Sequence, residues 1–318
     1  MTGVCFASRA GFAGCETSCR NAAAVLGGQW TVCGRDEYPP GVLDADLLVL
    51  SSWDKSYEAI LSAREGPTVP RWHSSLLQTE LAAEGWKISR LAGLLDEGAV
   101  PALAVNDESF VDALGREAVV FFPDVLDFRD YEDVRSAELA GVNVSLFGAG
   151  HLRKNLFVQS AAFMLARANA GGTDWTLHLN GQTAFDPTYG SWLEIIGVPY
   201  VDHGWLQRGD YLALVASMDA GLQVSLSESY CYAAADHLAL GVPVVTSPTI
   251  ACADAGPLVV ANPFDVEEVT DRLTQALARP ELVDGGRRSL HERAQMNAER
   301  ARSALTELLE RAGYPSAV

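Results

Sequence analysis

Short apolar runs alternate with longer amphipathic segments along the first 137 residues. Apolar runs bounded by glycine and polar residues are typical of buried strands, and the segments between them show the apolar spacing of helices. Strands that alternate with helices predict a parallel sheet covered by helices on both faces. The predicted strands are GVCFAS, WTVCG, DLLVLSS, VPALAVN and AVVFFP, and the predicted helices include CETSCRNAAAVLG and HSSLLQTELAAEG.

The same alternation resumes after the acidic segment PDVLDFRDYEDVRSAELAG, which we interpret as a linker between two α/β domains. We place the first domain at residues 1–137, the second at 138–288 and a charged helical tail at 289–318. The second domain is predicted to contain the strands VNVSLFGAG, TDWTLHLNG, VPYVDHG, GLQVSLS and GVPVVTS, and the helices HLRKNLFVQSAAFMLARANAGG and LQRGDYLALVASMD.

Composition narrows the class of protein. The chain has 318 residues, of which 48% are hydrophobic, so two domains and a substantial core are expected. The net charge of −18 argues against a basic nucleic-acid surface, because both halves carry more acidic than basic residues. The six cysteines form no C-x-x-C pair, which favours reduced thiols over a zinc site. No signal peptide or membrane span is predicted, so a cytoplasmic location is expected.

Two carboxylates stand out between two predicted buried strands. Glu228 and Asp236 are eight positions apart, so a helix starting after Ser227 would place both on one face. Helix starts at the carboxyl ends of parallel strands also present backbone N–H groups that attract phosphate. Two hydroxyl-binding acids beside a phosphate site would suit a sugar nucleotide. A helix cap for Glu228 and a helix-surface position for Asp236 remain the simpler structural alternatives.

This segment resembles the Glu-x7-Glu signature of retaining, nucleotide-sugar-dependent glycosyltransferases. The resemblance implies an α/β fold of the GT-B type, with two Rossmann-like domains facing across a cleft and the tail packing back on the first. The segment departs from the family pattern at two positions, because Asp236 stands in place of Glu and Cys231 in place of Gly. Matching residues are Ser227, Glu228, Tyr230, Asp236, Gly241, Pro243, Val244 and Val245.

A second segment, FGAGHLRKN, resembles the family's phosphate-binding loop. Gly148, Lys154 and Asn155 match it, whereas Ala149 replaces the usual Arg, and Arg153 is the nearest substitute. The resemblance implies that a donor diphosphate binds at Lys154 and at backbone amides of the loop. Without this resemblance, the simpler interpretation is that Arg153 and Lys154 are solvated side chains at the start of a helix.

The remaining candidates come from the same resemblance. His73 is predicted to face the sugar and the acceptor, although a structural histidine is the common alternative. Gly14 ends a glycine-containing loop after the first strand, and His203 lies in a loop near the nucleotide base. Ser229 and Tyr230 belong to the donor-binding signature beside Glu228. Trp53 and Trp72 could stack on an acceptor, but core packing is the simpler role for each.

Together these features predict an enzyme that moves a sugar from a nucleotide sugar to an acceptor hydroxyl. The resemblance implies retention of anomeric configuration, no metal and no cofactor, with Glu228 holding the sugar and Asp236 the ribose. The donor sugar, the base and the acceptor are left open. The alternatives are an epimerase of the same fold, a sugar-nucleotide-binding protein without transfer activity, and a glycosyltransferase acting on hydroxylated bases in DNA.

Overall fold

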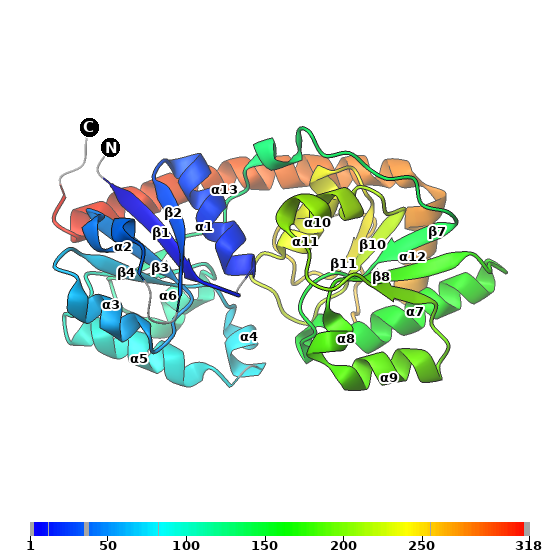
Figure 1. Cartoon of the computed structure of the whole chain (residues 1–318), viewed down its shortest axis with the longest axis horizontal. Coiled ribbons are helices and arrows are strands. Elements are labelled where there is room, and N and C mark those ends of the chain that lie inside the picture. Colours follow the sequence, from blue (N-terminus) through cyan, green and yellow to red (C-terminus); the bar gives the residue numbers. More distant parts are fainter. Residues whose placement is uncertain (1–2, 12, 35–37, 82, 255, 315–318) are drawn as a thin grey trace. The chain divides into compact units, whose positions relative to one another are not determined.

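The chain forms two compact α/β units in a computed structural model that describes residues 3–314 except residues 12, 35–37, 82 and 255. The first unit consists of Met1–Asp127 with Ala294–Val318, and the second of Phe128–Arg293. Each unit contains a parallel sheet with helices on both of its faces, as Figure 1 shows. The predicted α/β class with two parallel sheets is therefore confirmed.

Six parallel strands build the sheet of the first unit in the order β2-β1-β3-β4-β5-β6. Phe6 in β1 lies beside Trp30 of β2 on one side and Val49 of β3 on the other. Strands of this kind are buried on both faces, which explains why their sequences are almost continuously apolar. The strands are β1 (Val4–Arg9), β2 (Gln29–Cys33), β3 (Leu47–Ser51), β4 (Thr68–Trp72), β5 (Leu103–Val105) and β6 (Val119–Phe121).

Two apolar clusters form the core of the first unit, one on each face of its sheet. Phe6 belongs to one cluster together with Leu26 and Leu305, whereas the next residue, Ala7, belongs to the other together with Leu91. Alternate residues of a strand point to opposite faces, which accounts for this division. The helices are α1 (Ala13–Leu26), α2 (Pro40–Asp44), α3 (Tyr57–Ala63), α4 (Leu76–Leu81), α5 (Gly85–Asp96) and α6 (Ser109–Leu114).

The sheet of the second unit has five parallel strands in the order β11-β10-β7-β8-β9. Its main apolar cluster includes Val144, Leu177 and Leu222 from three neighbouring strands, and Phe163 from the helix that follows the first of them. The strands are β7 (Val142–Ser145), β8 (Trp175–Leu179), β9 (Tyr200–Asp202), β10 (Ala220–Gln223) and β11 (Val244–Thr246). The α-helices are α7 (Leu156–Asn169), α8 (Gln182–Phe185), α9 (Pro187–Ile195), α10 (Arg208–Val215), α11 (Tyr232–Ala239) and α12 (Val266–Ala278), and the 3-10 helices are η1 (Phe128–Tyr131), η2 (Leu152–Lys154) and η3 (Pro280–Leu282).

Helix α13 (Val283–Arg311) begins in the second unit and ends in the first. Its last turns bury Ala301, Leu305 and Leu308 in the core of the first unit. The sequence indicated a helical tail from residue 289, and the helix starts slightly earlier. Among the described residues, no helix is both long enough and apolar enough to cross a membrane.

Two segments differ from their predicted structure. The run HSSLLQTELAAEG was expected as one helix, but α4 ends at Leu81 and α5 begins at Gly85, with Ala83 in a left-handed conformation between them (φ 52°). The second unit begins at Phe128, within the acidic segment that we interpreted as a linker, and not at residue 138. Phe128 stacks on His291, with ring centroids 4.2 Å apart, so aromatic side chains attach this segment to the second unit.

Candidate functional site

The candidate site lies at the carboxyl ends of β7, the central strand of the second sheet, and of its neighbour β10. From β7 the chain moves outward to β8 and β9, then returns to β10 and β11 on the other side of β7. The loops that leave these two neighbouring strands therefore diverge. The place where the strand order reverses in this way is called a topological switch point. Open parallel sheets bind ligands in the crevice outside it. The loops are residues 146–155 and 224–231.

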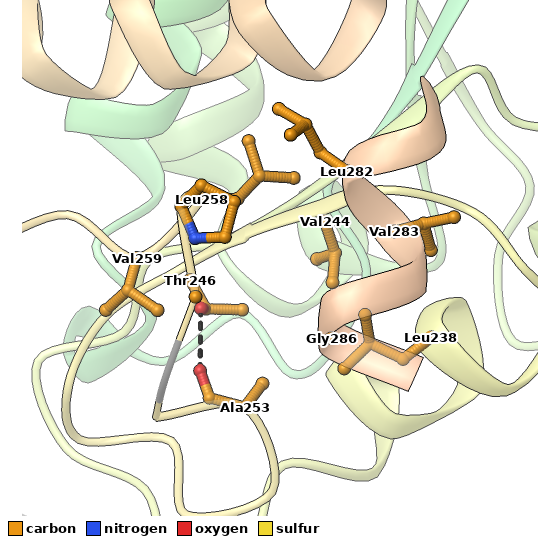
Figure 2. A pocket seen from close by; sticks show the side chains of 11 residues that line it. Leu238, Val244, Thr246, Ala253, Leu258, Val259, Leu282, Val283 and Gly286 are labelled. Carbon is orange, nitrogen blue, oxygen red and sulfur yellow. Dashed lines mark hydrogen bonds between the residues drawn. The ribbon is translucent and has the colours of Figure 1, made fainter. Parts of the chain in front are cut away.

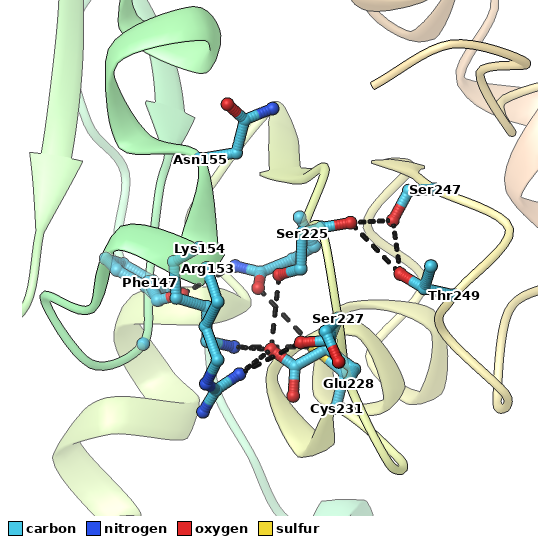
Figure 3. Close-up of polar contacts among 12 residues, drawn as sticks. Phe147, Arg153, Lys154, Asn155, Ser225, Ser227, Glu228, Cys231, Ser247 and Thr249 are labelled. Atoms are coloured by element: carbon cyan, nitrogen blue, oxygen red, sulfur yellow. Dashed lines mark hydrogen bonds and ion pairs between the residues drawn. The ribbon is translucent and has the colours of Figure 1, made fainter. Parts of the chain in front are cut away.

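A buried carboxylate joins the two loops. Glu228 Oε1 accepts hydrogen bonds from Arg153 at 2.7 Å and from the Ser225 hydroxyl at 3.2 Å, and it forms an ion pair with Lys154 (Figure 3). All three charged side chains are largely buried, with Glu228 only 7% exposed. Among the described residues, no hydrogen bond engages the other oxygen, Oε2, which is thus available to a ligand hydroxyl.

The charges of this cluster determine its protonation. Burial alone raises the pKa of Glu228, but the positive charges of Lys154 and Arg153 outweigh burial and hold the pKa below its ordinary value. Glu228 is therefore ionised at neutral pH. Two cations and one anion leave a net positive charge at the switch point, in a chain whose net charge is −18. An anionic ligand is favoured there.

Lys154 is not the solvated cation at a helix start that the structural alternative described. Its side chain is 10% exposed, because the loop after β10 brings Glu228 onto it. Gly148 has a positive φ of 127°, and a Cβ at that position would lie 3.3 Å from both Cε and Nζ of Lys154. Gly148 thus leaves room for the lysine. Its own amide donates to Asn180 Oδ1 at 2.8 Å and is not directed at a ligand.

Helix α7 begins directly after Lys154 and Asn155. In the described part of the chain, the side chain of the N-cap residue Asn155 makes no capping hydrogen bond, so backbone N–H groups of the first turn remain for an anion. Gln159 in the same turn donates to the carbonyl of Lys154 at 2.6 Å and accepts from the amide of Val224 at 2.7 Å. This glutamine fixes the two loops relative to each other.

Glu228 does not start a helix, contrary to the sequence-based expectation. Helix α11 begins at Tyr232, and β10 already ends at Gln223, so the residues between them form a loop. Cys231 adopts a left-handed conformation with φ 67°, which is rare for a residue with a side chain. The related signature has glycine there, and the structure retains the backbone conformation that glycine favours. Glu228 and Asp236 consequently do not share one helical face.

Asp236 is buried and has protein partners for both of its oxygens. Arg208 donates to Oδ2 at 2.8 Å and to Oδ1 at 2.7 Å, and the Tyr131 hydroxyl donates to Oδ1 at 2.8 Å. The carboxylate is only 1% exposed. Asp236 thus connects α11 to α10 and to η1. Arg208 and Tyr131 bind the two oxygens that were expected to contact a ribose.

Changing Asp236 to asparagine should therefore lower stability by about 2 kcal/mol, because largely buried Arg208 would lose the charge of its nearer partner and keep only the more distant Asp130, at 3.7 Å, among the described residues. Thermal unfolding measures this loss, and Asp271→Asn on the exposed face of α12 is the matched control. An unchanged melting temperature combined with a raised KM for a nucleotide sugar would instead support the ribose contact.

His73 lies at the carboxyl edge of the first sheet, directly after β4. Its Nδ1 is 3.7 Å from Asp124 Oδ1. The same oxygen forms an ion pair with Arg71 at 2.9 Å. Burial and the Arg71 charge lower the pKa of His73, so the imidazole is neutral at neutral pH. Nδ1 then carries the proton facing the carboxylate. Nε2 is buried, has no hydrogen-bond partner among the residues that the structure describes, and presents a lone pair.

The other candidate residues occupy different positions. His203 follows β9 and stacks on His178, with 2.9 Å between their ring nitrogens. Gly14 lies in the first turn of α1, and the glycine with a positive φ in that loop is Gly11 (φ 88°). Ser229 and buried Tyr230 share the loop of Glu228.

The structure thus brings together four predicted residues, Gly148, Arg153, Lys154 and Glu228. Trp53 and Trp72 are buried in the core, which is the simpler of the two roles considered for them from the sequence. The sequence interpretation did not identify Ser225, Gln159, Arg208 or Asp124. Ser225 lies within the predicted strand GLQVSLS, and a polar residue at its end was the available signal. Arg208 and Asp124 gave none, because their partners are distant in the sequence, and Gln159 gave none because its contact with Val224 also joins distant segments.

A small cavity elsewhere in the second unit does not suit a substrate. It measures about 20 Å³, space for roughly one water molecule, and Figure 2 shows mostly apolar side chains around it. Leu238, Val244, Leu258, Leu282 and Val283 are among the residues that line it. Within the described part of the chain, no group of three or more His, Cys, Asp or Glu side chains could hold a metal ion.

No protein-family model matches the sequence, and no curated protein matches it. Solved structures match nearly the whole chain. A UDP-forming α,α-trehalose-phosphate synthase from Burkholderia xenovorans is 13% identical, with a TM-score of 0.68 over 98% of this chain and 100% of that one. HepE from Anabaena, in complex with UDP and glucose, is 13% identical with a TM-score of 0.70 over 98% and 100%. The trehalose-6-phosphate synthase OtsA is 11% identical with a TM-score of 0.71 over 96% and 99%. The chain has the fold of the GT-B glycosyltransferases.

Proposed function

We propose that this protein is a glycosyltransferase that moves a sugar from a UDP-sugar to an acceptor hydroxyl. The observation that carries the proposal is the buried cluster of Arg153, Lys154 and Glu228 at the switch point of the second sheet. It combines cations for a diphosphate with a free carboxylate oxygen for a hydroxyl. Matching solved structures include a UDP-forming synthase and a complex with UDP and glucose, which favours uridine as the base.

The proposed mechanism is electrostatic. Lys154, Arg153 and the first amides of α7 would bind the diphosphate and offset the charge that develops as the glycosidic bond breaks. Glu228 Oε2 would accept a hydrogen bond from a donor-sugar hydroxyl. We further propose retention of configuration, with the acceptor attacking from the face of the departing phosphate and a phosphate oxygen taking its proton.

Other residues have supporting roles in this proposal. His73 Nε2 would accept a hydrogen bond from a substrate hydroxyl, and Gly14 would lie near the phosphate. Ser229 and Tyr230 would shape the sugar site, and His203 would lie near the base. Asp236 is proposed to act as a positioning residue that fixes Arg208 and Tyr131.

Binding of UDP tests the proposal most directly. At a concentration about 100 times its Kd, a specific ligand stabilises the folded state by about 2.7 kcal/mol, which raises the melting temperature by several degrees. We expect such a shift with UDP and UDP-sugars, and smaller shifts with GDP, ADP, CMP and dTDP. No shift with any nucleotide would refute the donor site. A shift without donor hydrolysis or transfer would indicate a binding protein.

Turnover should survive EDTA, because Lys154 and Arg153 would take the role of a metal on the diphosphate. An Asp-x-Asp pair does occur at Asp44 and Asp46, but it precedes β3 and lies at the amino edge of the first sheet. Asp46 Oδ2 there accepts from the amide of Gly3 at 2.7 Å. Activity that disappears on chelation and returns with manganese or magnesium would contradict metal independence.

A further inference from the structure

Four side chains form a cluster at the carboxyl edge of the first sheet, which we call the Trp86 cluster. Trp72 is the last residue of β4, Lys55 follows β3, and Trp86 and Lys87 lie in the first turn of α5. Lys55 Nζ is 5.6 Å from the Trp86 ring centroid, and Lys87 Nζ is 5.9 Å from the centroids of both Trp86 and Trp72. Two ammonium groups thus surround one indole.

The Trp86 indole is exposed, whereas the neighbouring Trp72 ring is buried. Trp86 is 50% exposed, whereas Trp72 beneath Lys87 is 2% exposed and donates to Thr79 Oγ1 at 3.1 Å. Cation–π attraction holds each ammonium near an aromatic ring. An aromatic face of this kind, kept at a ligand-binding edge and not packed in the core, is available to stack on a ring of a bound molecule.

The cluster is locally positive in an acidic unit. Arg9 is paired with Asp54, and Lys87 is paired with Glu84. Glu58, in the helix after Lys55, is paired with Arg90 at 3.0 Å. Among the described residues, Lys55 has no carboxylate within ion-pair distance. Lys55 therefore contributes one positive charge to the Trp86 cluster that no carboxylate of the cluster's neighbouring pairs neutralises. The first unit as a whole has 12 Lys or Arg against 21 Asp or Glu.

We propose that the Trp86 cluster binds the acceptor and that the acceptor is a small saccharide bearing a phosphate or carboxylate group. Trp86 stacks on the apolar face of the sugar ring, and Lys55 and Lys87 pair with the anionic group. The acid surplus of the unit disfavours a polyanion such as DNA, because such a ligand would extend past the positive edge onto negative surface. This inference rests on the proposed glycosyltransferase function.

Calorimetry on the full chain saturated with UDP tests the inference, with glucose 6-phosphate, glucuronate, glucose and oligothymidylate as probes. Wild-type protein should bind the two anionic sugars at least about tenfold more tightly than glucose, with affinity falling as salt rises. Lys55→Ala should weaken anionic-sugar binding about tenfold, and Trp86→Ala about fivefold. UDP binding should be unchanged in both variants.

Trp30→Ala is the matched control, because Trp30 is also exposed, at 45%, but belongs to β2 and has no ammonium group over its ring among the described residues. The inference is overturned by equal binding of glucose and its phosphate, by absent anionic-sugar binding, by unaffected Lys55→Ala and Trp86→Ala variants, or by tighter binding of oligothymidylate. Each of these results with a normal UDP shift would refute the acceptor assignment alone. Absence of the UDP shift would refute the proposed function itself.

Discussion

Glu228→Gln should lower kcat/KM for the UDP-sugar roughly tenfold to a hundredfold while tightening the binding of UDP itself. The variant keeps the shape of the side chain but removes its charge. Hydrogen bonds to a carboxylate contribute about 1.5–3 kcal/mol each, and Glu228 Oε2 is the proposed acceptor for a sugar hydroxyl. The loss of transfer therefore follows from the sugar contact.

The gain in UDP affinity has a separate cause. In the wild-type protein, Glu228 neutralises part of the positive charge of Arg153 and Lys154. Its carboxylate lies 2.7 Å from Arg153. Without that carboxylate, both cations are free to attract the diphosphate, and we expect UDP to bind about tenfold more tightly. The unliganded variant should also melt at a lower temperature, because two largely buried cations repel each other, and UDP should restore much of the loss.

Calorimetry with UDP, steady-state kinetics and thermal unfolding measure these three effects. Glu292→Gln, at an exposed position of α13, is the matched control and should change none of them. Full activity in Glu228→Gln would remove Glu228 from the sugar site. Weaker UDP binding would show that Glu228 is not an internal counter-ion for the phosphate-binding cations.

Sequence pattern predicted the strands well because most of them are buried on both faces. Leu47–Ser51 is buried at every position, so its run of apolar residues is a direct consequence of where it lies. Helix ends were predicted less well. The start of α11 depends on the left-handed conformation of Cys231, and a cysteine gives no local signal for that conformation.

The candidate site could be located from the sequence only in part. Resemblance brought Lys154 and Glu228 into the same site, but the residues alone could not show that they form a buried ion pair. They are far apart in the sequence, and the strand order of the second sheet is what brings their loops together. Asp236 was matched by position in the signature, whereas Arg208 and Tyr131, its actual partners, lie outside it.

Lys154→Met should lower stability by about 2–3 kcal/mol as well as weaken UDP binding at least tenfold. Removing one member of a buried ion pair leaves the other charge poorly compensated, and Glu228 would keep Arg153 and Ser225 as its only side-chain partners among the described residues. A lysine in the solvated position of the structural alternative would give a change below about 1 kcal/mol. Arg116→Met is the control, because its pair with Asp96 is exposed.

The double variant Lys154→Met with Glu228→Gln separates folding from binding. Both members of the pair are then uncharged, so its loss of stability should be smaller than the sum of the two single losses by about 1–3 kcal/mol. UDP binding should nevertheless stay weaker than in the wild-type protein, because the phosphate loses a cation. Chemical denaturation and calorimetry give both quantities. Additive stability losses would mean that Lys154 and Glu228 do not interact in the folded protein, and unchanged UDP affinity would remove Lys154 from the phosphate site.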